Sequence, residues 1–205
     1  MLASAVVDVH ELRRRVDELA ARDANYRVFG ASSHKYRFHA PVEEAVIAAL
    51  EGAHGFRLPE DFRAFVLTVG NGGAGPSYGV IPFHGKDSED YTDYTRLGTA
   101  WKYADAHNPE HLLWGDEDDQ GDDDQEARQR AYWAACESTG AFYLCHHGCA
   151  SRSLLVVSGP QRGEVWHDET ANDAGLYPAV SAAGARLTFT TWYLDWIDTE
   201  LAKLA

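Results

Sequence analysis

The chain lacks any long apolar run, and no stretch approaches the roughly 20 residues that a helix needs to cross a bilayer. The first thirty residues also lack the basic, then apolar, then small-residue pattern of a secretory signal peptide. Cysteine is scarce, and the three that are present are an odd number, which argues against a disulfide framework. Together these absences predict a cytoplasmic protein in a reducing environment, without a membrane anchor.

Positive charge is also in short supply, with 18 Lys and Arg against 32 Asp and Glu and a net charge of −14. Nucleic-acid binding depends on basic side chains that neutralise phosphates, so this balance disfavours it and favours a basic protein partner. Residues 116–126 hold eight acids and no base, which leaves 24 acids against 18 bases, or −6, elsewhere. We interpret this segment as a solvated acidic loop that steers the partner through Asp116, Glu117, Asp118, Asp119, Asp122, Asp123, Asp124 and Glu126.

Apolar and aromatic residues, by contrast, are plentiful. The composition is 45% hydrophobic, with 6 Trp, 10 Tyr and 8 Phe, which is enough to bury a cooperative core without disulfides. A length of 205 residues suits one domain with an extension, or two small domains. The sequence shows no internal repeat and no linker that would divide it in two.

The stretch Leu58–Phe83 carries the clearest local signals. Pro59 suits the first turn of a helix, and the two acids after it stand where the helix dipole favours them. An apolar stripe at i, i+3, i+4 and i+7 continues this helix, and Gly70 is the expected left-handed cap. A glycine-rich turn then leads to a short strand over residues 79–83, with positive φ expected at Asn71, Gly72, Gly73 and Gly75. Because phosphate-binding loops run from strand through glycines to helix, the reverse order argues against a phosphate site here.

Periodicity and turn residues predict further elements on both sides of this stretch. Helices are expected over 5–25, over 41–52, over 126–136 and from Thr190 or Thr191 toward the C-terminus. Strands are expected over 111–114, 141–145 and 153–158, and the turn Gly159–Gly163 joins the last of these to the next strand as a hairpin. The polar residues 85–110 show no clear period. The expected strands lie mainly in the second half of the chain, after the first helices, which agrees with an α+β domain.

Three motifs, in this order, resemble the SUKH superfamily, whose members carry a Smi/Knr-type domain. They are the helix and glycine turn of residues 58–73, the hairpin of residues 148–166 and the aromatic closing helix of residues 190–197. The resemblance runs from about residue 41 to the C-terminus, and it implies helices packed against a mostly antiparallel sheet. We therefore divide the chain into an N-terminal helical extension, residues 1–40, packed on a SUKH-like domain, residues 41–205. The resemblance implies no catalytic residues.

The cluster Cys145–Cys149, which reads CHHGC, offers ligand types for zinc. Strand alternation would place Cys145, His147 and Cys149 on one face. A structural zinc site needs four ligands, usually from two paired clusters, and only His167 is a nearby candidate for the fourth. Cys149 could also be drawn as a nucleophile beside a histidine, but reactive thiols need an electropositive setting. We favour a strand end that runs into a turn, with no metal and no catalytic residue.

The acidic segment partly matches a calcium-binding loop. Acidic or amide side chains and a glycine occupy several of the expected places, but the twelfth place holds Ala127 instead of a bidentate acid. A solvated loop is the simpler interpretation.

The predicted function follows from the resemblance and the charge. Many bacterial SUKH proteins are thought to neutralise toxins, so the prediction is a non-enzymatic immunity protein, without cofactor, that binds a cognate bacterial toxin and occludes its active site. A basic nuclease is the target that the acidic loop would suit. The alternative is a regulatory or scaffold interaction domain with an endogenous partner, and the third is an enzyme that uses the Cys145–Cys149 cluster.

Overall fold

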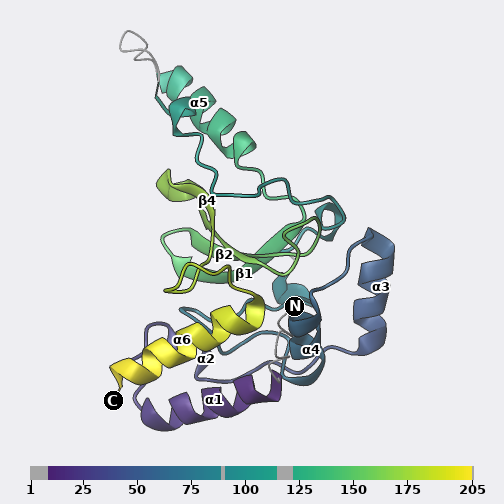
Figure 1. The fold of residues 1–205 in the computed structure, drawn as a ribbon, viewed down its shortest axis with the longest axis vertical. Coiled ribbons are helices and arrows are strands. Elements are labelled where there is room, and N and C mark those ends of the chain that lie inside the picture. The colour runs from purple at the N-terminus through teal and green to yellow at the C-terminus, as the bar shows by residue number, and fades with distance from the viewer. Residues whose placement is uncertain (1–8, 89–90, 115–121, 205) are drawn as a thin grey trace.

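The structure, a computed structural model, describes residues 9–88, 91–114 and 122–204. Figure 1 shows a central sheet with helices below it and one helix, α5, projecting above it. The helices are α1 (Val9–Arg22), α2 (Ala31–His34), α3 (Glu44–His54), α4 (Glu60–Thr68), α5 (Asp122–Ala135) and α6 (Phe189–Lys203). The strands are β1 (Ala141–Gly148), β2 (Ser151–Val156), β3 (Val165–Glu169) and β4 (Gly175–Pro178). Single 3₁₀ turns cover Lys86–Ser88, Tyr94–Arg96, Glu110–Leu112 and Thr170–Asn172.

The four strands form an antiparallel meander in the order β1-β2-β3-β4. A register shift in β1 between Tyr143 and Cys145 turns two successive side chains, Leu144 and Cys145, into the core. Outside the strands, Val80 forms isolated bridges to Gly73 and Cys145, which attach the glycine turn to the free edge of β1. The α+β architecture that was predicted from the sequence is therefore confirmed.

Both faces of the sheet are covered. On one face, α1, α4 and α6 bury a large cluster that includes Leu12, Phe65 and Tyr193, none of them exposed. On the other face, a smaller cluster joins Trp166 of β3 to Trp101 and to Tyr132 of α5. Because the sheet is covered on both sides, its strands carry few exposed side chains.

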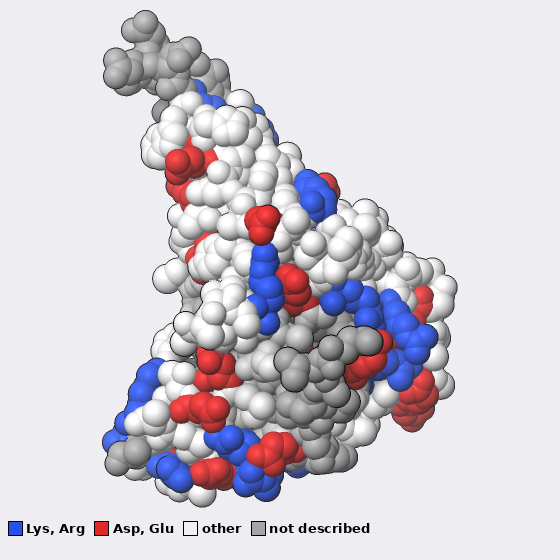
Figure 2. Space-filling model, in the orientation of Figure 1, with Lys and Arg blue, Asp and Glu red and all other residues white. Residues whose placement is uncertain are grey.

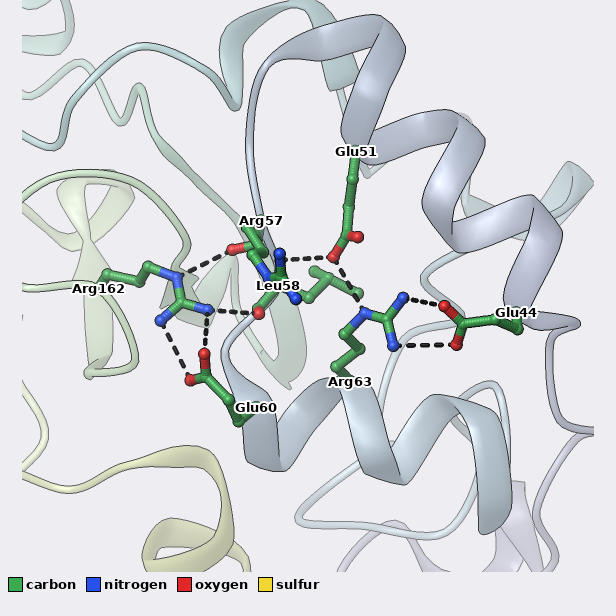
Figure 3. A network of polar contacts seen from close by, with 7 residues as sticks. All are labelled: Glu44, Glu51, Arg57, Leu58, Glu60, Arg63 and Arg162. Atoms are coloured by element: carbon green, nitrogen blue, oxygen red, sulfur yellow. Dashed lines mark hydrogen bonds and ion pairs between the residues drawn. The ribbon is translucent and has the colours of Figure 1, made fainter.

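Polar contacts lock the helical layer to the hairpin between β2 and β3 (Figure 3). Arg162, in the hairpin turn, donates hydrogen bonds to the carbonyl oxygens of Arg57 and Leu58 and to both carboxylate oxygens of Glu60. Arg63 of α4 pairs in the same way with Glu44 of α3 and also contacts Glu51. The residues that begin α4 are thus tied both to the sheet and to the preceding helix.

Most elements form near their predicted positions. The hairpin of β2 and β3 and the strand β1 are confirmed. The closing helix begins two or three residues earlier than expected, because Thr188 and Thr191 cap it reciprocally. Thr190 lies inside that helix and donates its backbone N–H to Asp61 at 3.0 Å. The helix predicted over 41–52 is α3, which starts later and continues to His54.

Gly70 is not the left-handed cap that was predicted, because its φ is not positive. A Cβ there would lie 2.7 Å from both the carbonyl oxygen of His39 and the Cβ of Phe38, so close packing requires glycine. Of the four turn positions, Gly72 and Gly73 have positive φ, at 82° and 106°. Asn71 instead holds the turn through its side chain, which accepts the N–H groups of Phe83 and His84.

Two predicted strands are wrong, and two elements were missed. Residues 79–83 pair only through the bridges of Val80. Residues 111–114 follow Pro109 into the 3₁₀ turn Glu110–Leu112, where the N–H of Leu112 donates to the carbonyl of Pro109 at 2.9 Å. The short elements α2 and β4 were not predicted.

The N-terminal helix α1 packs against α4 and α6. Arg13 donates to the carbonyl of Val69 at 3.1 Å, and Arg15 forms an ion pair with Asp198. The division of the chain at residue 40 stays a prediction. Among the described residues, none of the helices has the length and apolarity needed to cross a bilayer.

Candidate functional site

The cysteine and histidine cluster lies at the end of β1 and in the turn after it. Cys145 is fully buried, and its thiol donates to the carbonyl oxygen of Pro76 at 3.1 Å. Burial raises the pKa of Cys145, so the thiol stays protonated and is a poor nucleophile. Cys145 therefore behaves as a packing residue.

His147 stands between two serine hydroxyls. Its Nδ1 lies 2.9 Å from the Oγ of Ser77, and its Nε2 lies 2.8 Å from the Oγ of Ser153 on β2. The Ser153 hydroxyl is also 3.5 Å from Nδ1 of His167 on β3, so the polar chain crosses three strands. Burial, with His167 beside it, lowers the pKa of His147 to about 4, and burial lowers that of His167 as well. Both rings are neutral at pH 7 and serve as hydrogen-bonded parts of the sheet.

Cys149 does not continue the strand. Gly148, Cys149 and Ala150 all have positive φ, at 100°, 48° and 63°, and they form the tight turn from β1 to β2. The expected alternation therefore breaks before Cys149, whose side chain is exposed while Cys145 is buried. Within the described ranges, no three or more His, Cys, Asp or Glu side chains are grouped so that they could hold a metal ion.

A cleft of about 640 Å³ opens beside this turn. It is bounded by the glycine turn, by α2 and by the end of β1, and its lining includes His34, His39, Tyr78, Tyr91 and His146. Burial lowers the pKa of His34, whose ring packs edge-on against Tyr36 and Trp196. The cleft combines aromatic rings with imidazole rings.

Of the acidic residues predicted to contact a partner, those that the structure describes belong to α5, on the far side of the sheet from α1 and α6 (Figure 1). Asp116, Glu117, Asp118 and Asp119 fall outside the described residues, whereas Asp122, Asp123 and Asp124 form the first turn of α5. The helix was expected to begin only at Glu126, so the last part of the predicted loop is helical. Acids at a helix start favour this earlier beginning through the helix dipole. Glu126 is exposed and forms an ion pair with Arg130 one turn later, at 3.1 Å.

The projecting helix is anchored by one face. Tyr132 is fully buried and donates its hydroxyl to Asn108 at 2.9 Å, while Tyr103 donates to the carbonyl of Ala135 at 2.8 Å. A neighbouring face of the helix exposes Trp133, which is 53% accessible, and the segment before the helix exposes Trp114, which is 72% accessible. Sequence reasoning missed both residues. The signal for Trp133 was present, because it stands about 100° around the helix from Tyr132, its buried neighbour in sequence.

Comparison with known proteins assigns the family. Residues 41–173 match the SMI1 / KNR4 family (SUKH-1). The matched range begins just before α3 and ends after the 3₁₀ turn that follows β3. The chain belongs to this family, as its motifs predicted. The closing helix α6 and the first helix α1 lie outside the matched range. No curated protein and no solved structure matched the chain.

Proposed function

We propose that this protein is a non-enzymatic immunity protein of the cytoplasm, which binds one cognate bacterial toxin and occludes its active site. Family membership supports the general role, since many bacterial SUKH proteins are thought to be immunity proteins. The internal engagement of Cys145 and His147 supports a binding role over a catalytic one. The Cys145 thiol has a raised pKa, and the His147 imidazole is neutral and hydrogen-bonded at both ring nitrogens. Neither group is therefore suited to nucleophilic chemistry.

The observation that supports the choice of partner is the clustering of negative charge in one segment of the sequence. Eight acids fall within residues 116–126, and the described end of this segment is the first turn of the projecting helix α5 (Figure 1). Clustered charge accelerates association with a partner of opposite sign and disfavours partners of like sign. A toxin with a positive cleft, such as a nuclease, is the partner of matching chemistry.

Co-expression tests the proposal. The toxin domain encoded by the neighbouring gene is induced in a sensitive host with and without this chain, and survival is counted. We expect the chain to restore growth. A matched variant in which the eight acids of residues 116–126 become Asn or Gln should protect less, because the toxin then binds more slowly. Equal killing with and without the wild-type chain contradicts the proposal, and recovery of a resident cellular protein as its stable partner supports a regulatory domain instead.

A further inference from the structure

The cleft beside the turn from β1 to β2 is lined by uncharged side chains and by rings. None of the described residues that line it is Asp, Glu, Lys or Arg. Tyrosine and histidine rings form its walls, and Val80, Ile81 and Pro82 add aliphatic surface. Its volume of about 640 Å³ lies within the range of roughly 300–1,000 Å³ that is typical of small-molecule sites. The cleft is therefore large enough and apolar enough for a ring-containing ligand.

This lack of negative charge sets the cleft apart from the rest of the molecule. Figure 2 shows acidic and basic side chains next to one another at the bottom of the view, where α1 lies in Figure 1. The segments that supply most of the cleft, residues 24–42, 64–85 and 138–151, contain no Asp or Glu, although the chain has 32 of them. Tyr91 follows two acids, residues 89–90, that lie outside the described part of the chain.

Close backbone packing forms the cleft in advance of any ligand. Gly30, before α2, approaches the carbonyl oxygen of Ser77 so closely that a Cβ on Gly30 would collide with it. A Cβ on Gly79 would collide in the same way with the carbonyl oxygen of Gly73. Val80 bridges both Gly73 and β1, which fixes the glycine turn to the edge of the sheet. A preformed site of this kind loses little conformational entropy when a ligand binds.

Tyr78 forms an exposed wall of the cleft that neighbouring rings hold in place. The residue is 47% exposed. Its ring contacts Phe29 edge-on, with the centroids 5.4 Å apart, and His146 with the centroids 5.8 Å apart. The three rings come from the loop before α2, from the glycine turn and from β1. A ring that is both fixed and exposed offers a stacking surface at low entropic cost.

The polar groups of the cleft can donate hydrogen bonds. The Nδ1 atom of His146 accepts the backbone N–H of Gly148 at 3.2 Å, so in the neutral ring the proton lies on Nε2. Among the described residues, no hydrogen bond engages this Nε2 or the hydroxyl groups of Tyr78 and Tyr91. These donors are free to meet acceptor atoms of a ligand.

The charges near the cleft favour an anionic ligand. The charged side chains of residues 24–42 are Arg27, Lys35 and Arg37, all of them exposed, and the other two segments have none. Free donors with cations nearby suit a ligand that brings acceptor oxygens and a negative charge. A carboxylate suits the cleft better than a phosphate, because none of the described lining residues is Lys or Arg.

We propose that this cleft binds an aromatic carboxylate, that is, a planar ring compound with a single carboxylate group. The ring stacks on Tyr78 and contacts the aliphatic surface of Val80 and Ile81. The carboxylate accepts a hydrogen bond from Nε2 of His146. The inference goes beyond the proposed immunity function and does not depend on it.

Three related probes test the requirement for charge. They are N-acetyl-tryptophan, which carries a carboxylate, its uncharged amide, and tryptamine, which carries an ammonium. Isothermal titration calorimetry measures each probe against the full chain. N-acetyl-tryptophan should bind with a Kd of about 0.1–1 mM, which is ordinary for a ligand of its size. The amide should bind about 5–10-fold more weakly, because hydrogen bonds to a charged group are stronger, and tryptamine should bind more weakly still.

Variants locate the site. Tyr78→Ala removes the exposed wall and should weaken the binding of N-acetyl-tryptophan about 10-fold, whereas Tyr78→Phe keeps the ring and should retain most of the affinity. His146→Phe keeps a ring without the N–H donor, so it should abolish the preference for the carboxylate over the amide. Tyr177→Ala is the matched control, because Tyr177 is 37% exposed and lies on β4, at the other edge of the sheet. Thermal unfolding checks that each variant is folded.

Four results would overturn the inference. Tryptamine that binds as tightly as N-acetyl-tryptophan would show a site for cations. An amide that binds as tightly as the acid would show that the carboxylate plays no part. Equal affinities in Tyr78→Ala and Tyr177→Ala would place the ligand outside the cleft. Absence of binding heat for every probe at millimolar concentration and at two temperatures would show that the cleft takes no such ligand. Each of these results leaves the proposed toxin binding untouched.

Discussion

Arg162 provides a quantitative test of how the fold is held together. Its guanidinium donates to the carbonyl oxygens of Arg57 and Leu58 and to both carboxylate oxygens of Glu60 (Figure 3). The Glu60 side chain is 82% exposed, so this ion pair contributes only about 0.2–1 kcal/mol. Each bond to a backbone carbonyl contributes roughly 1 kcal/mol. We therefore expect Arg162→Ala to lower the free energy of unfolding by about 2–3 kcal/mol.

Urea and thermal unfolding measure this loss directly. For a chain of this length, 2–3 kcal/mol corresponds to a Tm decrease of about 4–12 °C. Arg162→Lys should recover only part of the stability, because one ammonium cannot serve two carbonyls and a carboxylate together. Glu60→Gln should cost no more than about 1 kcal/mol, since it removes only the exposed pair. The reasoning fails if Glu60→Gln costs as much as Arg162→Ala, or if Arg162→Ala costs nothing measurable.

Three further predictions concern groups buried in or near the core. Asp23 is 1% exposed, and although burial raises its pKa, hydrogen bonds from the N–H of Val28, the hydroxyl of Tyr36 and a further backbone N–H outweigh burial and lower the pKa. The stability that Asp23 contributes is therefore present above its unfolded pKa and is lost as pH falls through its folded pKa. Asp23→Asn should reduce the loss of stability in acid, measured by urea unfolding at several pH values, and an unchanged loss would count against this. The pKa of His147 is about 4 in the folded chain against about 6.5 in the unfolded chain. The free energy of unfolding that depends on neutral His147 should therefore be fully present above about pH 6.5 and fall by at most about 3 kcal/mol toward about pH 4. NMR titration of the ring measures the folded pKa, and a value near 6.5 would contradict the buried, hydrogen-bonded geometry. Of the three free cysteines, Cys149 is exposed and the other two are buried. A thiol reagent should therefore label one site in the native protein and three sites in urea. Rapid labelling of a second site in the native protein would contradict the burial of the other two.

Local signals in the sequence were enough to identify the frame of the domain. Pro59 with its following acids, and the turn Gly159–Gly163, act through neighbouring backbone, so they do not depend on distant contacts. The α+β class and the β2–β3 hairpin were accordingly predicted. Gly70 shows the limit of such reasoning, because its role depends on the approach of His39, which no local pattern encodes.

The candidate site was less accessible to prediction, for physical reasons. The acidic residues were evident from composition. The sequence did not fix the residue at which α5 begins, and acids at the start of a helix favour the observed beginning at Asp122 through the helix dipole. The exposure of Trp133 depends on which face of α5 meets Trp101 and Trp166, and this is a tertiary property. Cys149 has a positive φ in the turn after β1 and is exposed, whereas Cys145 is buried, so strand alternation does not describe how these two residues are placed.

The central claim is that this protein binds a toxin and does not catalyse a reaction. Isothermal titration of the purified chain with the inactivated toxin domain from the neighbouring gene tests this most directly. The account predicts a saturable 1:1 complex whose affinity falls as salt rises, because the chain carries a net charge of −14 and the proposed partner is basic. Absence of binding heat at every salt concentration and temperature, with both proteins folded, would contradict it.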